Sequence, residues 1–405
     1  MKKITILLLA FILLTGTLVG CTPDETPEVS ETETEATTDA TEEPTAEPTQ
    51  EPAIELAGEE LEIKYSSSFS ITTYGNDIKL VTDGEGQKFF LVPKSIDEVP
   101  TLPTEAADAT VIRTPVDSAV FGSTTQVGSL LAIADDAVLD SIGGVSSGAY
   151  SWYIDAIEER LADGRIAFIG GDGFTDPDYE AIIALEPDIA FLYTGDWGQQ
   201  DIMTKLTELG ISSAIDNDYL EGGYMSRLEW IRFIAAFYNL DEVAYDYMLE
   251  QEVLVESVKA DIESLDKPKV VWASIWEGIV YVTGADTYAA KQITDAGGEY
   301  VFADYGDTSA GLTMEEFYEQ SKDADILIYA SNAMWMTNPT ITGILEMAPV
   351  LAEMKAVIDG NVYALSDDYF TASYKVARSV KDLAAMFNPE LYTDWSIESY
   401  DKLPE

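Results

Sequence analysis

One uninterrupted helical stretch, residues 241–265, most strongly constrains how this 405-residue chain can fold. It contains neither proline nor glycine and is dense in Glu, Val, Leu and Ala, so it favours a single helix. Asp266-Lys267-Pro268 follows and is expected to end that helix. At 1.5 Å per residue the helix would be about 37 Å long. A stiff segment of this length is expected to join two separate folding units.

Short β-rich runs alternate with amphipathic helical patterns on both sides of the long stretch. Before it, the predicted strands are residues 109–112, 142–145, 166–170, 188–193 and 211–215. After it, they are residues 270–275, 278–282, 326–330 and 362–365. Such alternation is typical of βαβ units with a largely parallel sheet. The sequence therefore predicts an α/β fold with two Rossmann-like lobes, residues 108–240 and 268–395, joined by a helix within residues 241–267.

A smaller unit is predicted ahead of the first lobe. Residues 61–107 alternate apolar and polar types, as in Lys88-Phe89-Phe90-Leu91-Val92, around an Asp83-Gly84-Glu85-Gly86 turn. This pattern indicates a β-hairpin extension.

The amino terminus has the pattern of an export signal. Lys2 and Lys3 precede an uncharged run, residues 4–19, that is shorter than the roughly 20 apolar residues of a membrane-spanning helix. The run ends in Leu18-Val19-Gly20-Cys21, which resembles the lipobox of lipoproteins, whose cysteine is diacylated. A cleaved secretory peptide with an incidental cysteine is the alternative, but Cys21 is the only cysteine of the chain. We expect a signal peptide over residues 1–20 and a chain anchored to the cell membrane by lipid, facing outside the cytoplasm.

The segment after the cysteine, residues 21–60, is strongly acidic. It contains fourteen Asp or Glu residues and no Lys or Arg, with repeated Thr, Pro and Glu. Like charges repel and little apolar surface is available for burial, so a disordered tether is predicted, with an acidic interaction tail as the alternative. The net charge of the whole chain is -52, which repels nucleic acid and anionic head groups. Contact with the membrane is therefore expected through the lipid anchor only, and no nucleic-acid partner is expected.

The chain contains no histidine. This absence excludes Ser-His-Asp and Cys-His catalysis, His-ligated haem and His-rich zinc sites. Gly170-Gly171-Asp172-Gly173 is not a phosphate loop, because the Lys and the Ser or Thr of such loops do not follow it. We therefore predict no enzyme activity, no cofactor and no resident metal. An enzyme on a similar two-lobed frame is the alternative.

The order of elements resembles that of a known family. The features that carry the resemblance are Leu185-Glu186-Pro187-Asp188-Ile189 at a step from helix into strand, Leu228-Glu229-Trp230-Ile231, the long connecting helix, and a final helix over residues 374–387. Residues 108–390 are similar to the substrate-binding proteins that deliver iron-siderophore complexes or cobalamin to ABC importers. The resemblance implies a monomer with little hinge bending, a ligand in the cleft between the lobes, and an importer permease as partner.

In this family, one Glu on the outer rim of each lobe pairs with arginines of the permease. The matching positions are Glu180, shortly before the Leu-Glu-Pro-Asp step, and Glu315, in the helix before the strand of residues 326–330. Both fall in the first turn of a predicted helix, where a carboxylate also interacts favourably with the helix dipole. Helix capping is therefore the alternative role, and Glu316 is a neighbour that could replace Glu315.

Aromatic side chains follow several of the predicted strands, where ligands bind in open α/β sheets. The ligand-binding candidates of this type are Tyr150, Trp152, Tyr153, Tyr193, Trp197, Trp276, Trp335, Tyr369 and Phe370. Ordinary packing is the alternative role for each of these rings. The nearby basic candidates are Arg227, Lys291, Lys375 and Arg378.

The basic groups are few for a triply anionic catecholate, so a neutral ferric hydroxamate or a corrinoid suits this composition better. A different small solute, such as an amino acid, peptide or sugar, and a role as a surface adhesin are kept as alternatives.

Overall fold

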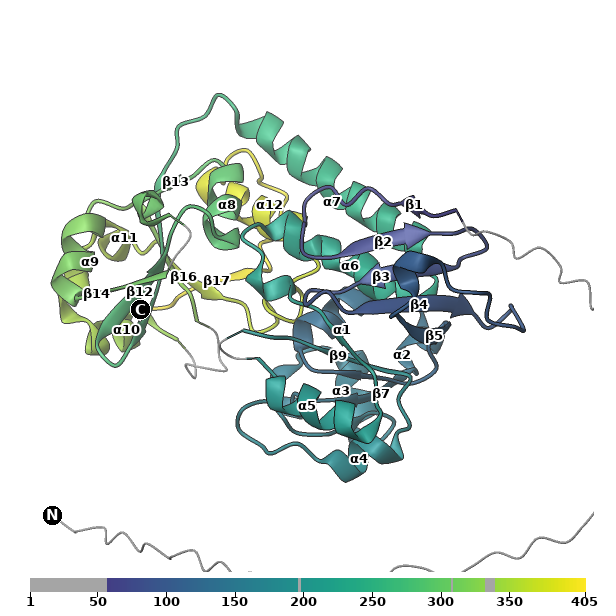
Figure 1. The fold of residues 1–405 in the computed structure, drawn as a ribbon. Helices are drawn as coiled ribbons and strands as arrows, with labels where there is room; N and C mark the ends of the chain where they lie inside the picture. Colours follow the sequence, from purple (N-terminus) through teal and green to yellow (C-terminus); the bar gives the residue numbers. More distant parts are fainter. Residues whose placement is uncertain (1–56, 196–197, 307–308, 332–338) are drawn as a thin grey trace, which may run out of the picture. The chain divides into compact units, whose positions relative to one another are not determined.

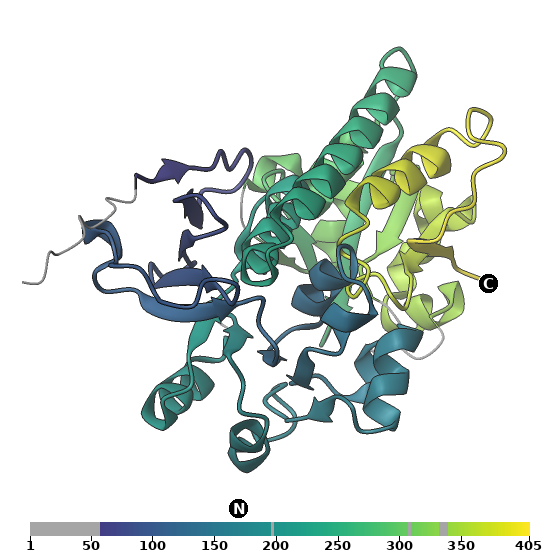
Figure 2. The same cartoon turned by 90° about the vertical axis from the view of Figure 1, so that its right-hand side faces the viewer.

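The computed structural model describes residues 57–195, 198–306, 309–331 and 339–405 (Figures 1 and 2). Within these residues there are three sheets, of five, five and seven strands. The first belongs to the extension, the second to an N-terminal lobe (N-lobe) and the third to a C-terminal lobe (C-lobe). The predicted fold class is confirmed: two α/β lobes are joined by one long helix. No described helix has both the length and the apolar run that a membrane span requires.

The N-lobe sheet is parallel throughout, with strand order β10-β9-β6-β7-β8. Its strands are β6 (Ala119–Phe121), β7 (Ile142–Val145), β8 (Ala167–Phe168), β9 (Ile189–Leu192) and β10 (Ser213–Ile215). Its helices are α1 (Thr124–Leu131), α2 (Asp136–Leu139), α3 (Asp155–Ala162), α4 (Tyr179–Ala184) and α5 (Gln200–Leu209). The sequence prediction missed the central strand β6, because three residues are too few to establish an alternating pattern.

The extension is a sheet rather than a hairpin, with strand order β1-β2-β3-β4-β5. These strands are β1 (Glu59–Glu60), β2 (Ser70–Thr73), β3 (Lys79–Thr82), β4 (Lys88–Pro93) and β5 (Thr110–Thr114). The prediction that residues 109–112 begin the N-lobe sheet is wrong, because β5 pairs in parallel with β4. Assigning residues 59–60 to the tether is also wrong, since β1 pairs with β2. Strand propensity does not identify the sheet that a strand joins.

Helix α6 (Tyr224–Tyr238) completes the N-lobe, and α7 (Asp241–Ile262) follows it and joins the lobes. Helix α6 packs against extension strands β3 and β5, against α1 and against α7, and Figure 1 shows it between these elements. Its ring Phe233 meets Phe191 of β9, and Phe237 meets Phe89 of β4. Helix α7 is the long connecting helix predicted from the sequence (Figure 2).

The C-lobe sheet has the order β14-β12-β11-β15-β16-β17, and β13 also pairs with β11. Its strands are β11 (Lys269–Trp276), β12 (Ile279–Thr283), β13 (Glu299–Tyr300), β14 (Ser309–Leu312), β15 (Ile326–Tyr329), β16 (Val362–Leu365) and β17 (Tyr400–Lys402). Its helices are α8 (Tyr288–Asp295), α9 (Met314–Ser321), α10 (Ile341–Met347), α11 (Lys355–Ile358) and α12 (Val376–Phe387). Strands β11, β13, β15 and β16 are mutually parallel. Strands β12 and β17 pair antiparallel with β11 and β16, and β14 pairs antiparallel with β12.

A buried lysine from the extension fixes the corner between α6 and α7. Lys79 is 3% exposed, and its Nζ lies 2.8 Å from Asp241 Oδ2 at the start of α7. The same ammonium donates to Asn239 Oδ1 at 3.1 Å and to Ala236 O at 3.4 Å. Asn239 has a left-handed backbone, with φ of 56°, and ends α6. The ammonium group of Lys79 therefore binds a carbonyl oxygen at the end of α6 and a carboxylate at the start of α7.

We expect Lys79→Met to lower the free energy of unfolding by about 2 to 3 kcal/mol, because Asp241 and the end of α6 lose their partner while the apolar volume is kept. Chemical denaturation followed by circular dichroism measures this loss. The control is Lys88→Met in the same sheet, whose partner Asp108 is 74% exposed, so a loss below about 1 kcal/mol is expected. Equal losses for the two variants would contradict the role given to Lys79.

Candidate ligand-binding cleft

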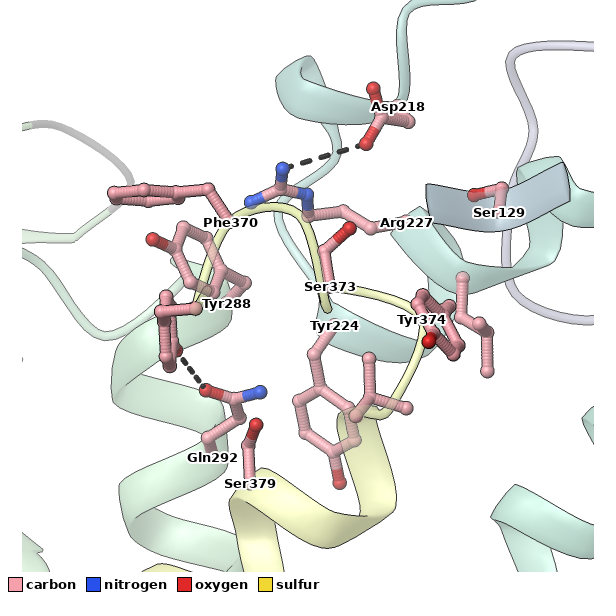
Figure 3. Close-up of a pocket in the computed structure, with 13 residues that line it drawn as sticks. Ser129, Asp218, Tyr224, Arg227, Tyr288, Gln292, Phe370, Ser373, Tyr374 and Ser379 are labelled. Atoms are coloured by element: carbon pink, nitrogen blue, oxygen red, sulfur yellow. Dashed lines mark hydrogen bonds and ion pairs between the residues drawn. The ribbon is translucent and has the colours of Figure 1, made fainter. Parts of the chain in front are cut away.

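A narrow cavity lies where the two lobes meet (Figure 3). The N-lobe side comes from α1, α6 and the 3₁₀ turn Asp218–Leu220, and the C-lobe side comes from α8 and the segment around the start of α12. Its volume is about 30 Å³. The lining residues are Ser129, Asp218, Tyr224, Arg227, Leu228, Tyr288, Gln292, Tyr369, Phe370, Ser373, Tyr374, Val376 and Ser379.

Two glycines allow the lobes to approach closely beside this cavity. A Cβ atom on Gly128 of α1 would lie 2.4 Å from the carbonyl oxygen of Thr371. A Cβ atom on Gly222 would lie 2.6 Å from the carbonyl oxygen of Asp286. Both distances are shorter than van der Waals contact, so any larger residue would push the lobes apart.

Arg227 of α6 is the cationic residue in the cavity lining. Its Nη2 lies 3.5 Å from Asp218 Oδ2, and its guanidinium lies 4.5 Å from the centre of the Tyr288 ring on α8 (Figure 3). Asp218 also accepts a hydrogen bond from Thr125 Oγ1 at 3.2 Å. The guanidinium therefore pairs with a carboxylate of its own lobe and stacks on an aromatic ring of the other lobe.

The carboxyl groups of Asp216 and Asp218 both interact with the charge of Arg227. Burial raises the pKa of Asp216, and the negative charge of Asp218 raises it further. Burial also raises the pKa of Asp218, although the positive charge of Arg227 opposes this shift. The backbone N–H of Asp218 donates to Asp216 Oδ1 at 3.0 Å. The cation of the cleft is thus balanced from within the N-lobe, and the cavity presents little net charge to a ligand.

Tyrosines form much of the remaining wall. Tyr369 is buried and donates its hydroxyl to Gln292 Oε1 at 3.1 Å. Burial raises the pKa of Tyr369 well above its ordinary value, so the ring stays neutral. The hydroxyl of Tyr224 donates to Asp295 across the lobes. Such a wall offers apolar faces together with neutral hydrogen-bonding groups.

The structure brings some of the predicted ligand residues to this cavity and places others elsewhere. Tyr369 and Phe370 line it. Lys375 and Arg378 instead line a second small cavity, which shares Tyr369 and Ser379 with the first. There Arg378 donates to Ser396 O at 2.7 Å and lies 2.8 Å from a carboxylate oxygen of Glu398.

The other predicted rings differ greatly in exposure. Tyr150 and Trp276 are 54% and 60% exposed, and Tyr193 is half-buried against Tyr219. Trp152 is fully buried and donates its indole N–H to Ser147 O at 3.1 Å, so this side chain belongs to the core of the N-lobe. Trp197 and Trp335 lie outside the described residues.

Sequence reasoning missed two residues of the cavity lining and one exposed ring outside it. Tyr224 and Tyr288 lie on helices. The residue pattern within one lobe predicts only ordinary packing for these two rings. Phe174 is 76% exposed in the loop after β8, where Asp172 Oδ1 accepts the backbone N–H groups of Phe174 and Thr175. Its sequence signal is the glycine-rich run around Asp172.

Both glutamates assigned to permease docking are exposed in the first turn of a helix. Glu180 lies in α4, which is capped by Asp178 through a 2.9 Å bond from Ala181 N. Glu315 lies in α9, which is capped by Thr313 together with Glu316, whose carboxylate accepts from Thr313 N at 2.9 Å. Neighbouring side chains therefore provide the caps, and Glu316 is already engaged in one.

Comparisons with known proteins agree with this architecture. The family model of the periplasmic binding proteins matches residues 120–369. An uncharacterized lipoprotein of Methanocaldococcus jannaschii is 33% identical over 78% of this chain and 75% of its own length. The chain belongs to the periplasmic binding protein family, as the sequence predicted.

Solved structures show the same fold. A periplasmic binding protein of Veillonella parvula matches with a TM-score of 0.56 and 15% identity, over 80% of this chain and 99% of that one. The periplasmic haem-binding protein of Vibrio cholerae matches with a TM-score of 0.55 and 17% identity, over 67% of this chain and 99% of that one.

The raised pKa of Asp216 makes stability depend on pH. Because its pKa in the folded state lies above the ordinary value of 3.8, the contribution of this carboxyl group to stability falls as pH rises from about 4 towards neutrality. Asp216→Asn keeps the oxygen that accepts from Asp218 N but carries no charge. We therefore expect the melting temperature of the variant, relative to wild type, to increase between pH 4 and about pH 7.

Calorimetry or circular dichroism at several pH values measures this difference, with Asp176→Asn, an exposed carboxyl, as the control. A difference that is constant across the pH range would show that the charge on Asp216 carries no penalty.

Proposed function

We propose that this chain is an extracytoplasmic solute-binding lipoprotein that captures a metal chelate and delivers it to an ABC-type importer. The observation that carries the proposal is a cleft walled by tyrosines between two lobes of the periplasmic binding protein fold. Arg227, whose charge is paired with Asp218, also lines this cleft. The related lipoprotein supports anchoring through Cys21, which lies outside the described residues. Family members are binding proteins, which supports a role without catalysis.

The charge balance of the cleft favours a neutral chelate, such as a ferric hydroxamate or a corrinoid. Arg227 is already paired with Asp218, so little uncompensated positive charge remains for a triply anionic ligand. The haem-binding neighbour supports a metal chelate in general terms. The narrow cavity is too small for any such ligand, so we place the chelate over the exposed rings at the strand ends, with the cavity as the floor of the site.

A smaller organic solute is the second candidate. The cavity volume of about 30 Å³ supports this alternative, because a small solute needs less separation of the lobes than a chelate does.

Ligand titration distinguishes the two candidates. The chain from residue 21 onward, with Cys21→Ser to prevent lipidation, is titrated with ferrichrome, ferric enterobactin, haemin, cyanocobalamin and cobinamide, using tryptophan fluorescence and calorimetry. We expect saturable binding of a neutral hydroxamate or a corrinoid, at micromolar concentration or below, and no binding of the catecholate. Silence across the set would contradict the chelate proposal and leave the smaller solute.

An exposed tyrosine of the strand ends is expected to contribute to binding. Tyr150→Ala should weaken binding of the chelate about tenfold, because the ring supplies apolar contact that the ligand covers. The matched control is Tyr245→Ala on α7, since Tyr245 is 55% exposed and Tyr150 is 54% exposed. An equal effect of the two variants would show that Tyr150 is not a ligand contact.

We also propose that Glu180 and Glu315 dock the protein to the permease. The double variant Glu180→Ala/Glu315→Ala should abolish uptake of the bound ligand while leaving its affinity intact, because neither side chain caps its helix. Transport by the reconstituted importer measures this effect. The control is Glu159→Ala/Glu346→Ala, which removes one exposed carboxylate from each lobe. Unchanged transport by the first pair would refute the docking assignment.

A further inference from the structure

The turn between β3 and β4 joins the extension to the edge of the N-lobe sheet. The N–H of Gly84 donates to Ile215 O at 3.0 Å, and the N–H of Ile215 donates to Asp83 Oδ2 at 2.8 Å. Ile215 belongs to β10, which is the edge strand of that sheet. The family model matches residues 120–369, so this turn lies outside the matched range.

The turn itself is rigid. Asp83 is 2% exposed, and its carboxylate also accepts the N–H groups of Glu85 at 3.0 Å and Gln87 at 2.8 Å. A Cβ atom on Gly84 would lie 3.0 Å from Asn217 Nδ2 and 3.2 Å from Ile215 O, so the turn fits tightly against the lobe. A tight, hydrogen-bonded turn can hold a side chain in one place.

The side chain that the turn holds is Glu85, which reaches the carboxyl ends of β9 and β10. Its Oε1 accepts from Thr194 Oγ1 at 2.8 Å and from Asn217 Nδ2 at 3.5 Å. Thr194 and Asn217 also bind each other, through Thr194 N to Asn217 Oδ1 at 2.9 Å and Asn217 Nδ2 to Thr194 Oγ1 at 2.8 Å. One carboxylate therefore closes a network between two loops of the binding edge.

The two residues of this network adjoin the candidate site. Thr194 follows Tyr193, a predicted ligand residue, and Asn217 precedes Asp218, which pairs with Arg227 in the cleft. A shift of either loop would move these neighbours with it. Removing the Glu85 carboxylate is expected to loosen both loops, because its accepting oxygen has two donors there.

We propose that Glu85 is a positioning residue of the ligand site, through which the extension holds the loops after β9 and β10 in their binding arrangement. This role rests on the proposed function in one respect, namely that the loops after β9 and β10 contact the ligand. It gives the extension a role in ligand affinity, whereas a purely structural extension would affect stability alone.

Hydrogen exchange measured by mass spectrometry tests the loops without any ligand. Glu85→Ala should raise the exchange of peptides covering residues 189–195 and 213–221, while strands β2 to β4 keep their protection and the melting temperature changes by less than about 3 °C. Glu85→Gln, which retains the accepting oxygen, should restore wild-type exchange. Glu98→Ala, an exposed glutamate of the extension, is the control. Unchanged exchange in Glu85→Ala, or general loss of protection across the extension, would overturn the proposal.

A second readout uses ferrichrome, haemin and cyanocobalamin as probes. For any probe that the wild type binds, Glu85→Ala should weaken affinity about tenfold and Glu85→Gln should restore it to within about twofold. Unchanged affinity in Glu85→Ala overturns the role in binding. If the wild type binds none of the three, the chelate proposal fails, and the exchange data alone decide whether Glu85 positions the loops.

Discussion

Helix α6 is packed on nearly all of its faces, and the arrangement of the surrounding elements depends on that packing. Thirteen of its fifteen residues are buried, and the two others are Arg227 and Arg232. A helix that is apolar on all sides must be covered on all sides. Here the extension sheet, the N-lobe and α7 provide the cover, so the extension belongs to the same core as the binding lobe.

The polar groups of α6 are correspondingly satisfied by named partners. Glu229 is 2% exposed, and its carboxylate accepts the backbone N–H groups of Lys64, Tyr65 and Ser66 at 2.6 to 2.8 Å. Burying a carboxylate without partners would cost several kcal/mol, so these three donors are required for the extension to lie where it does. The extension is therefore attached to α6 by charge as well as by apolar contact.

The sequence predicted most of this fold from local patterns. The long helix was recognisable because no proline or glycine interrupts residues 241–265, and β16 because its four apolar residues follow a turn. The assignment of residues 109–112 failed for a different reason. A strand pattern describes one pleated surface, whereas the choice between the extension sheet and the N-lobe sheet depends on partners far away in sequence.

The candidate site was less accessible to prediction, because it is formed by two lobes. Tyr369 and Phe370 were found because they follow a strand, where open α/β sheets bind ligands. Tyr288 lies on a helix face that becomes a cleft wall only when the other lobe is present. Trp152 follows a strand as well, yet it turns into the core. Position after a strand identifies the edge of the sheet, but not the direction of each side chain.

The position of Arg227 bears on how the cleft can open. Its ion-pair partner Asp218 belongs to the same lobe, whereas Tyr288 belongs to the other lobe. Separation of the lobes at this point would break the contact with the ring but keep the ion pair. A cation–π contact contributes about 0.5 to 2 kcal/mol, far less than the cost of leaving a buried charge unpaired. The arginine therefore imposes only a modest barrier to opening, and its charge remains compensated whether or not a ligand is present.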